Sequence, residues 1–290
     1  MKPAPFTHHA PRTLDEAIDI LGEVGHDGKI LAGGQSLIPV LNMRLAQPAH
    51  LVDINRVAGL DTVTVTDTHV RVGATVRHAA LQRHDEAYAV LPVLRQALRN
   101  VAHPAIRNRG TTIGSIAHAD AAGEMPSIAV LTGAVMEIVG PHGRREVAAA
   151  DFFEGPLQTV LEADELLEAV RFGRFGASTR TAFLESARRH GDYALAGVGV
   201  AVDVEGRGAE ATVRGARAAY VSVTDVPVVI DLTDAVAGQL ASSAWHGVEE
   251  LVQAGIAPEA DIHATSDYRR MLAAELTRRA LTEAMTEEGA

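Results

Sequence analysis

Apolar and polar positions follow two different periods along this chain, so the sequence predicts both helices and strands. Residues 14–24 place apolar side chains on one helical face behind Thr13, a typical N-cap residue. The segment 267–285 is the clearest helix of the C-terminal part. Residues 62–73 alternate apolar and polar side chains around a polar turn, and residues 135–147 flank a Gly-Pro-His-Gly turn, so both predict β-hairpins.

The order of the predicted elements indicates how the chain is divided. The first part alternates strands and helices, with strands expected at 29–32 and 50–54 and helices at 35–44, 90–101 and 127–132. The last part begins with strands and ends with helices, with strands expected at 181–187, 194–204 and 212–223. We therefore predict an α+β fold with a boundary near residues 173–178.

Composition excludes several classes of protein. The 290 residues carry a net charge of −11, and no Lys/Arg-rich segment suggests nucleic-acid binding. No apolar run is long enough for a membrane span. Residues 1–9 contain no apolar stretch resembling a signal peptide, so we expect a cytoplasmic protein.

The chain contains no cysteine. This excludes disulfides, catalytic thiols, thiolate-bound zinc and the usual all-cysteine iron–sulfur clusters from this polypeptide. Any relay of single electrons through metal clusters must therefore lie on another chain.

Two adjacent glycines, Gly33 and Gly34, lie between a predicted strand and a predicted helix. Paired glycines allow positive φ and close approach of a ligand to the backbone. The first amides of the following helix would point outward as an anion site, and Ser36 adds a hydroxyl donor. The alternative is an ordinary strand-to-helix turn.

A second glycine-rich segment, residues 107–120, contains almost no bulky side chain. Its residues Thr111, Thr112, Gly114 and Ser115 could surround a pyrophosphate with N–H and hydroxyl donors. The alternative is a buried loop against which another backbone packs closely. The two segments could converge on one dinucleotide, although neither matches the G-x-G-x-x-G or P-loop pattern.

Other features have competing interpretations. The Gly-Val-Gly sequence at 197–199 lies within an apolar run and favours strand packing over nucleotide binding. His118, Asp120 and Glu124 could hydrogen-bond a ribose or adenine, stabilise a loop or bind a metal, but no second histidine follows at metal-ligand spacing. Tyr193 could lie against a planar ring or in the core.

At these residues the chain resembles the FAD-binding medium subunits of the xanthine dehydrogenase, or molybdenum hydroxylase, family. It is most similar to bacterial forms such as the carbon monoxide dehydrogenase medium subunit. Residues 32–36, Ala-Gly-Gly-Gln-Ser, match the family's first flavin loop, and residues 107–120 match its second. Residues 191–193, Gly-Asp-Tyr, match a turn whose aromatic ring lies by the isoalloxazine. The resemblance extends over nearly the whole chain.

One position departs from the family pattern. The family's T-I-G-G becomes Thr-Thr-Ile-Gly at 111–114, so Ile113 stands where the first glycine is expected. Either the loop shifts by one residue, or one close approach of the backbone to the diphosphate is lost.

The resemblance implies a two-part FAD-binding (PCMH-type) domain at residues 1–175, with subdomains at about 1–55 and 56–175. A smaller α+β domain of the carbon monoxide dehydrogenase flavoprotein type would follow at 178–287. The residues expected to bind FAD are Lys29, Leu31, Ala32, Gly33, Gly34, Gln35, Ser36, Val101, Gly110, Thr111, Thr112, Gly114, Ser115, His118, Asp120, Glu124, Leu167 and Tyr193.

The resemblance also implies a role in a larger complex. A molybdopterin-containing large subunit would hydroxylate the substrate, and a small subunit with iron–sulfur (2Fe–2S) clusters would relay electrons to FAD on this chain, in a dimer of heterotrimers. We expect no catalytic acid or base and no metal site here, because the flavin carries the chemistry. The alternatives are a self-contained flavin oxidoreductase and a non-catalytic scaffold that has lost FAD.

Overall fold

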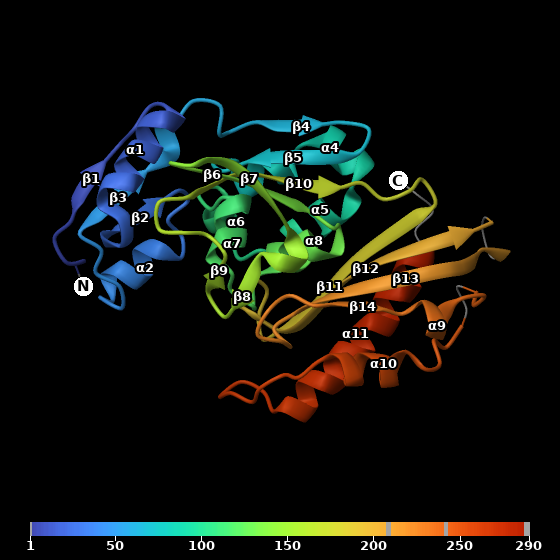
Figure 1. Ribbon diagram of the computed structural model, residues 1–290. Coiled ribbons are helices and arrows are strands. Elements are labelled where there is room, and N and C mark those ends of the chain that lie inside the picture. Colours follow the sequence, from blue (N-terminus) through green and yellow to red (C-terminus); the bar gives the residue numbers. More distant parts are fainter. Residues whose placement is uncertain (1, 207–209, 241–242, 287–290) are drawn as a thin grey trace.

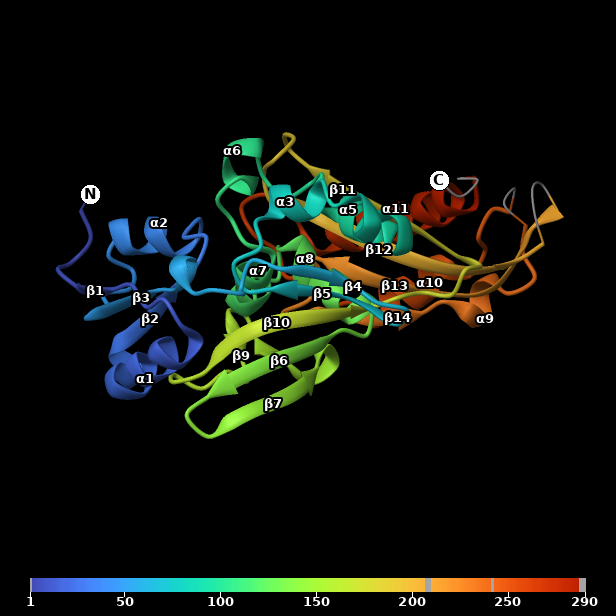
Figure 2. The same cartoon turned by 90° about the horizontal axis from the view of Figure 1, so that it is seen from above.

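The computed structural model describes residues 2–206, 210–240 and 243–286. Three main sheets lie in a row, and their order in space follows their order along the chain (Figures 1 and 2). One hydrophobic core extends from the N-terminal helix through the central sheet, and a second lies between the C-terminal sheet and the last helices. The mixture of helices and strands confirms the predicted α+β class.

The N-terminal sheet has three parallel strands in the order β1-β3-β2. Its strands are β1 (Thr7–His9), β2 (Gly28–Leu31) and β3 (His50–Asp53). The helix α1 (Leu14–Val24) lies between β1 and β2 in the chain, because parallel strands of one sheet need a crossover connection. The Thr13 hydroxyl accepts a hydrogen bond from the Glu16 amide, so the predicted helix and its N-cap are confirmed.

The central sheet has five antiparallel strands in the order β4-β5-β10-β6-β7, and it contains both predicted hairpins. Its strands are β4 (Val63–Val65), β5 (His69–Gly73), β6 (Val135–Gly140), β7 (Gly143–Ala148) and β10 (Leu166–Gly173). Strand β10 pairs with one strand of each hairpin and joins them into one sheet. A two-stranded sheet of β8 (Phe153–Gly155) and β9 (Gln158–Thr159) lies beside it.

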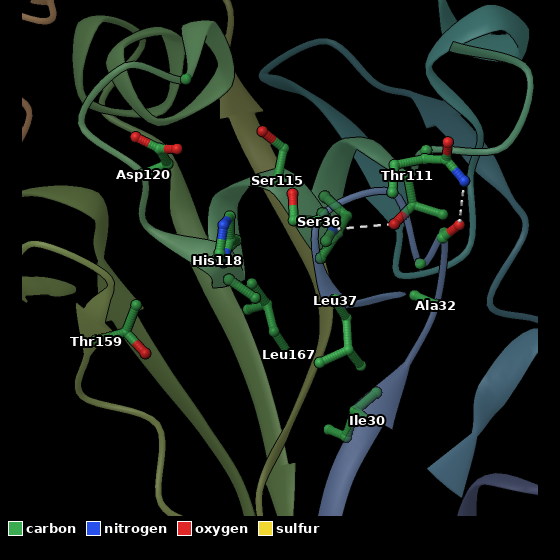
Figure 3. Close-up of a pocket in the computed structure, with 18 of the residues that line it drawn as sticks. Ile30, Ala32, Ser36, Leu37, Thr111, Ser115, His118, Asp120, Thr159 and Leu167 are labelled. Carbon is green, nitrogen blue, oxygen red and sulfur yellow. Dashed lines mark hydrogen bonds between the residues drawn. The ribbon is translucent and has the colours of Figure 1, made fainter. Parts of the chain in front are cut away.

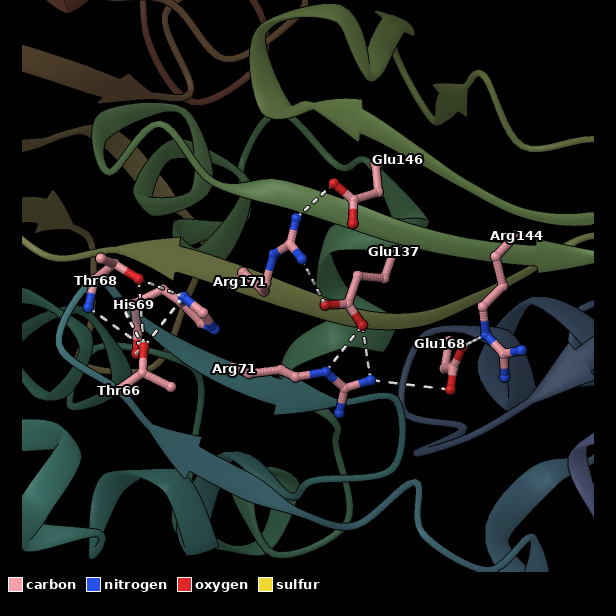
Figure 4. Close-up of polar contacts among 9 residues, drawn as sticks. All are labelled: Thr66, Thr68, His69, Arg71, Glu137, Arg144, Glu146, Glu168 and Arg171. Atoms are coloured by element: carbon pink, nitrogen blue, oxygen red, sulfur yellow. Dashed lines mark hydrogen bonds and ion pairs between the residues drawn. The ribbon is translucent and has the colours of Figure 1, made fainter.

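The outer face of the central sheet carries a ladder of ion pairs (Figure 4). Arg71 and Arg171 are direct cross-strand neighbours, as are Glu137 and Glu146. Each arginine pairs with a carboxylate: Arg71 contacts Glu137 at 2.7 Å and Arg171 contacts Glu146 at 2.6 Å. The alternation of outward charges with buried valines is typical of a sheet with one solvated face.

Short helices lie between the N-terminal sheet and the C-terminal domain. They are α2 (Leu37–Asn42), α3 (His78–Gln82), α4 (Asp85–Val90), α5 (Pro92–Leu98), α6 (Pro104–Arg107), α7 (Thr112–His118) and α8 (Glu124–Leu131). Of these, α4 and α7 contact strands of the central sheet. The helix predicted at 90–101 is confirmed as α5 with narrower bounds: it begins at Pro92, because proline has no N–H to continue α4 and suits the first position of a helix, and it ends at Leu98. The helix predicted at 127–132 begins earlier, at Glu124.

The C-terminal sheet is antiparallel, in the order β11-β12-β13-β14. Its strands are β11 (Thr179–Ala187), β12 (Ala194–Glu205), β13 (Thr212–Val221) and β14 (Val229–Asp231). Helices α5 and α8 pack on one face, and α10 (Val248–Gly255) and α11 (Ser266–Thr286) cover the other, with α9 (Thr233–Val236) at the edge. A Cβ on Gly199 would lie 3.2 Å from Leu131, which confirms the strand-packing interpretation of 197–199.

The predicted C-terminal helix is confirmed as α11, but its first turn buries a charged residue. Arg269 is buried, while Tyr268 and Met271 are exposed. Arg269 donates to the carbonyls of Leu195 and Ser222, at 2.7 and 3.1 Å, and forms an ion pair with Asp261. These bonds satisfy the two terminal nitrogens of a guanidinium that the apolar period alone would have placed in solvent, while its Nε has no partner among the described residues.

Candidate cofactor site

A cavity of about 920 Å³ lies where the N-terminal sheet, the central sheet and the start of β12 meet. This volume is within the range of sites for large organic ligands. The turn after β2 and the segment around α7 line it side by side (Figure 3). Ser36 belongs to the turn after β2, and Ser115 belongs to α7. The side chains of Ile30, Leu37 and Leu167 form an apolar part of the cavity wall.

The turn after β2 presents unpaired backbone donors. Among the described residues, none accepts a hydrogen bond from the amides of residues 33–36. Gly34 has a φ of 72°, which a side-chain-bearing residue rarely adopts. All four residues line the cavity. Successive free amides of this kind form an anion-binding concavity, so the turn has the donor chemistry that a phosphate requires.

Gly33 lies directly against the second glycine-rich segment. A Cβ at this position would be 2.7 Å from the Arg109 carbonyl oxygen, 2.7 Å from the Gly110 Cα and 2.8 Å from the Thr111 nitrogen. Such contacts are shorter than any real Cβ makes. The two segments predicted to converge are therefore in backbone contact, and only glycine fits between them.

Two polar side chains connect the segments behind the cavity. Asn55 donates from Nδ2 to the Ala32 carbonyl at 2.8 Å, and its Oδ1 accepts a 2.6 Å bond from Arg77. Arg77 also donates to the Arg109 carbonyl. This Asn55–Arg77 bridge holds one carbonyl of each segment, and sequence reasoning missed it because neither residue belongs to a glycine-rich motif.

We expect Arg77→Met to weaken FAD binding by about tenfold, because it removes both bonds that the guanidinium makes to the bridge. Asn55→Asp keeps the acceptor for Arg77 but loses the bond to Ala32, so its effect should be smaller. The dissociation constant can be measured by titrating FAD into the cofactor-free chain and following the flavin fluorescence. Equal FAD affinity in wild type and Arg77→Met, at equal thermal stability, would contradict the bridge's role.

The second segment is mostly helical rather than a loop. The Thr111 hydroxyl caps α7 by accepting from the Gly114 amide at 3.1 Å. Thr112 does not line the cavity, and its hydroxyl lies 3.2 Å from His78 Nδ1 in the protein interior. Among the described residues, the amides of Thr111 and Ile113 donate to none, so these two and the Ser115 hydroxyl are the donors directed at a ligand.

The isoleucine at the family's glycine position has a structural explanation. The Ile113 side chain is 1% exposed and belongs to the hydrophobic core, while its residue still lines the cavity. Its position in the first turn of α7 directs the side chain into the core and leaves the amide free. The close approach of this backbone therefore does not depend on glycine at 113.

A buried histidine supports the same segment. The His78 amide donates to the Gly110 carbonyl at 3.0 Å, and a Cβ on Gly110 would lie 2.9 Å from the His78 ring. Burial, together with nearby Arg107, lowers the pKa of His78 to about 4. The ring is therefore neutral at neutral pH and serves as a packing and hydrogen-bonding group.

Carboxyl groups gather at one end of the cavity. Burial, Glu185 and Asp120 raise the pKa of Glu124 against the smaller opposing effects of its own amide and Arg107, and the resulting pKa is about 8. Burial also raises the pKa of Glu185 to about 7, and its Oε2 is buried without a hydrogen-bond partner. Glu124 is thus a neutral hydrogen-bond donor at neutral pH, which suits contact with a carbonyl or ring nitrogen.

Tyr193 forms another part of the wall. It is 69% exposed and directly precedes β12, so it lies at the cavity rather than in the core. Partial loss of water contact at the cavity wall, together with nearby Asp120, raises its pKa, so the phenol stays protonated. Gly191 in the same turn has a φ of 89° and packs against the His103 ring. The exposed ring is available for stacking on a planar ligand.

The cavity gathers all but two of the residues expected to bind FAD. The exceptions are Thr112, whose hydroxyl faces His78, and Leu31, whose side chain lies against Gly34 on the other side of the turn. The structure also adds wall residues that sequence reasoning missed. These are chiefly Leu37, Ile54, His78, Ile106, Leu157, Gln158, Thr159, Leu161 and Glu162. Residues 157–162 carry no motif that could have indicated them.

Two other kinds of site are not found in the described part of the chain. No three His, Asp or Glu side chains there are placed to hold a metal ion, so His118, Asp120 and Glu124 do not form a metal cluster. No helix of residues 2–206, 210–240 and 243–286 is both long and apolar enough to cross a membrane.

Comparisons with known proteins agree with this geometry. Residues 4–174 match the family model "FAD binding domain in molybdopterin dehydrogenase", and residues 181–284 match "CO dehydrogenase flavoprotein C-terminal domain". The nicotine 6-hydroxylase medium subunit of Paenarthrobacter nicotinovorans is 36% identical over 98% of this chain and 99% of its own length. Carbon monoxide dehydrogenase of Hydrogenophaga pseudoflava has a chain with a TM-score of 0.90 at 34% identity, covering 98% of both chains. Quinoline 2-oxidoreductase of Pseudomonas putida 86 gives a TM-score of 0.90 at 36% identity, with 98% of each chain covered.

Proposed function

The chain belongs to the family of FAD-binding medium subunits of molybdenum hydroxylases, and from this premise we propose that its FAD receives electrons from iron–sulfur clusters on a partner subunit and passes them to an external acceptor. The relatives are subunits of dehydrogenases, so the chain is part of an oxidoreductase. FAD supplies the ability to take up one or two electrons.

The free amides of residues 33–36, in backbone contact with residues 109–111, carry this proposal. Together with the Thr111 and Ile113 amides and the Ser115 hydroxyl, they would hold the FAD diphosphate. Tyr193, Glu124 and Asp120 would contact the ring system or its polar edges from the other end of the cavity. None of these residues needs to act as acid or base on the organic substrate.

We infer the partner subunits from the absence of cysteine in this chain and from its family. The chain has no thiolate for an iron–sulfur cluster, so the donor of single electrons must lie on another subunit. One solved relative is described as lacking the Mo-pyranopterin moiety of its molybdenum cofactor, which supports a molybdopterin subunit in the complex. We propose a large molybdopterin subunit, a small iron–sulfur subunit and this chain in a dimer of heterotrimers.

We assign FAD binding to residues 1–175 and a C-terminal domain to residues 178–287. The family matches at 4–174 and 181–284 support this division. The C-terminal sheet shares core residues with α8 and supplies Tyr193 to the cavity, so the second domain also contributes to the site.

Two alternative functions make different predictions. A self-contained flavin oxidoreductase would turn over an organic substrate as an isolated chain. A scaffold without FAD would purify colourless even with its partners. The unpaired amides of residues 33–36 favour a phosphate-containing ligand over the scaffold.

Co-purification from the native host tests the proposed function. We expect the tagged chain to carry visible flavin absorbance and to bring down a large molybdopterin-containing chain and a small cysteine-rich chain. Adding the organic substrate should bleach the flavin only when both partners are present. Bleaching in the isolated chain would favour the self-contained enzyme, and a colourless complex would favour the scaffold.

A further inference from the structure

One arginine of the last helix is connected to the wall of the cofactor cavity through backbone atoms. Arg269 lies in the first turn of α11 and is 7% exposed. Its Nη1 donates to the carbonyls of Leu195 and Ser222, at 2.7 and 3.1 Å, and its Nη2 donates to Asp261 at 2.7 Å. The start of β12, the end of β13 and the loop before α11 are thus fixed to a single guanidinium.

The Leu195 carbonyl lies at an irregular point of the C-terminal sheet. Strands β11 and β12 pair with a shift of register between Ser186 and Ala187, and the pairing skips Leu195. A bulge of this kind re-aims the neighbouring side chains and leaves one residue outside the ladder. Tyr193, which lines the cofactor cavity, comes two residues earlier in the chain. The bond from Arg269 therefore fixes the backbone from which Tyr193 projects.

The Ser222 carbonyl leads to another part of the same wall. Ser222 directly follows β13 and has a φ of 64°, which a side-chain-bearing residue rarely adopts. Its amide donates to the Ala121 carbonyl at 2.9 Å, in the turn between α7 and α8. Asp120 of that turn lines the cofactor cavity, and its Oδ1 accepts from the Ala122 amide at 2.9 Å. Arg269 and this turn are therefore bonded to opposite ends of the same residue.

The charges that anchor the guanidinium are stable to pH. Hydrogen bonds from the amides of His263 and Ala264, together with Arg269 itself, lower the pKa of Asp261 to about 2. An arginine side chain is not deprotonated in a protein. Its planar fork also directs donors in several fixed directions at once, whereas a lysine ammonium is a compact point charge.

We propose that Arg269 is a positioning residue of the cofactor site, and that it holds Tyr193 and Asp120 in the places where they meet the flavin part of FAD. The inference rests on the proposed function and extends it to the C-terminal helix. Arg269 does not line the cofactor cavity, so it acts through the backbone of β12 and of the α7–α8 turn.

The test uses the purified complex, first depleted of FAD and then titrated with it. Arg269→Met removes all donors at similar side-chain volume, and Arg269→Lys keeps the charge without the planar fork. Arg270→Met is the matched control, because Arg270 is the next residue of α11 and pairs with exposed Asp267 at 3.5 Å. We expect the FAD dissociation constant to rise about tenfold in Arg269→Met, less in Arg269→Lys and not at all in Arg270→Met.

A double-mutant cycle separates positioning from general destabilisation. Tyr193→Leu removes one of the two side chains that Arg269 holds. Because Arg269 acts through Tyr193, replacing both should raise the FAD dissociation constant by less than the product of the two single increases. Two independent losses of stability would give the full product.

Hydrogen exchange in the FAD-depleted complex provides a readout without the cofactor. Arg269→Met should exchange faster than the wild type at residues 119–123 and 191–196, and like the wild type in the central sheet. If that variant does not assemble, Arg269→Lys takes its place in the comparison and should show a smaller increase at the same residues.

Wild-type FAD affinity in Arg269→Met, or the full product in the double variant, would show that Arg269 does not position the cofactor site. Unchanged exchange at residues 119–123 and 191–196 would show the same. A wild-type complex that purifies without flavin and does not bind added FAD would instead contradict the proposed function, and the positioning role with it.

Discussion

Replacing Gly33 with alanine should strongly weaken FAD binding to this chain while leaving its fold intact. The added Cβ would meet backbone atoms of Arg109, Gly110 and Thr111 at 2.7–2.8 Å. These atoms cannot rotate away as a flexible side chain could, so the two segments must separate. Overpacking of this kind typically costs about 1–3 kcal/mol.

The strain should appear mainly as lost cofactor affinity. Residues 33–36 and the Thr111 and Ile113 amides hold one diphosphate only while the segments stay in contact. We therefore expect the FAD dissociation constant to rise roughly 10- to 100-fold, which corresponds to the strain above. The measurement is the FAD content of the purified chain together with a fluorescence titration.

Gly22→Ala provides the matched control. Gly22 lies within α1, and a Cβ there would be 3.6 Å from Pro141, an ordinary contact. This variant should bind FAD like the wild type and be slightly more stable, because alanine favours helix over glycine. Wild-type FAD content in Gly33→Ala would show that the contact between the segments is not needed for binding.

The different success of the two motifs shows what local sequence can predict. The turn at Gly33 was recognisable because a strand, two glycines and a helix are adjacent in sequence. The second segment was harder, because its residues have different roles that depend on distant partners. Thr112 faces His78 and Ile113 enters the core, and neither neighbour is visible from the local pattern.

Other parts of the site depend on tertiary structure alone. The Asn55–Arg77 bridge joins a residue just after β3 to the N-cap of α3, and residues 157–162 reach the cavity because β9 packs beside α7. The hairpins and α1 were predictable because their periods are local. The sequence predicted that the two glycine-rich segments could converge on one ligand, but not that Gly33 and Gly110 touch. The number of residues between two positions does not determine the distance between their backbones.

A change of Glu124 to glutamine should alter how the protein's stability depends on pH. Burial, Glu185 and Asp120 raise the pKa of Glu124 to about 8, whereas an unfolded chain has the ordinary value of 4.5. Between these values the folded state keeps a proton that the unfolded state has lost. The free energy of unfolding must therefore fall as the pH rises through this window.

Glutamine resembles the protonated carboxyl and cannot ionise, so Glu124→Gln should lose less stability over the same range. From about pH 6 to about pH 8 the wild type should lose about 2 kcal/mol more than the variant, at about 1.4 kcal/mol per pKa unit. Urea unfolding of both cofactor-free chains, followed by circular dichroism at each pH, measures this difference. Glu23→Gln, at an exposed position of α1, is the control and should follow the wild type. Parallel profiles for Glu124→Gln and wild type would mean that Glu124 is ionised in the folded chain, and that it meets FAD as a hydrogen-bond acceptor rather than as a donor.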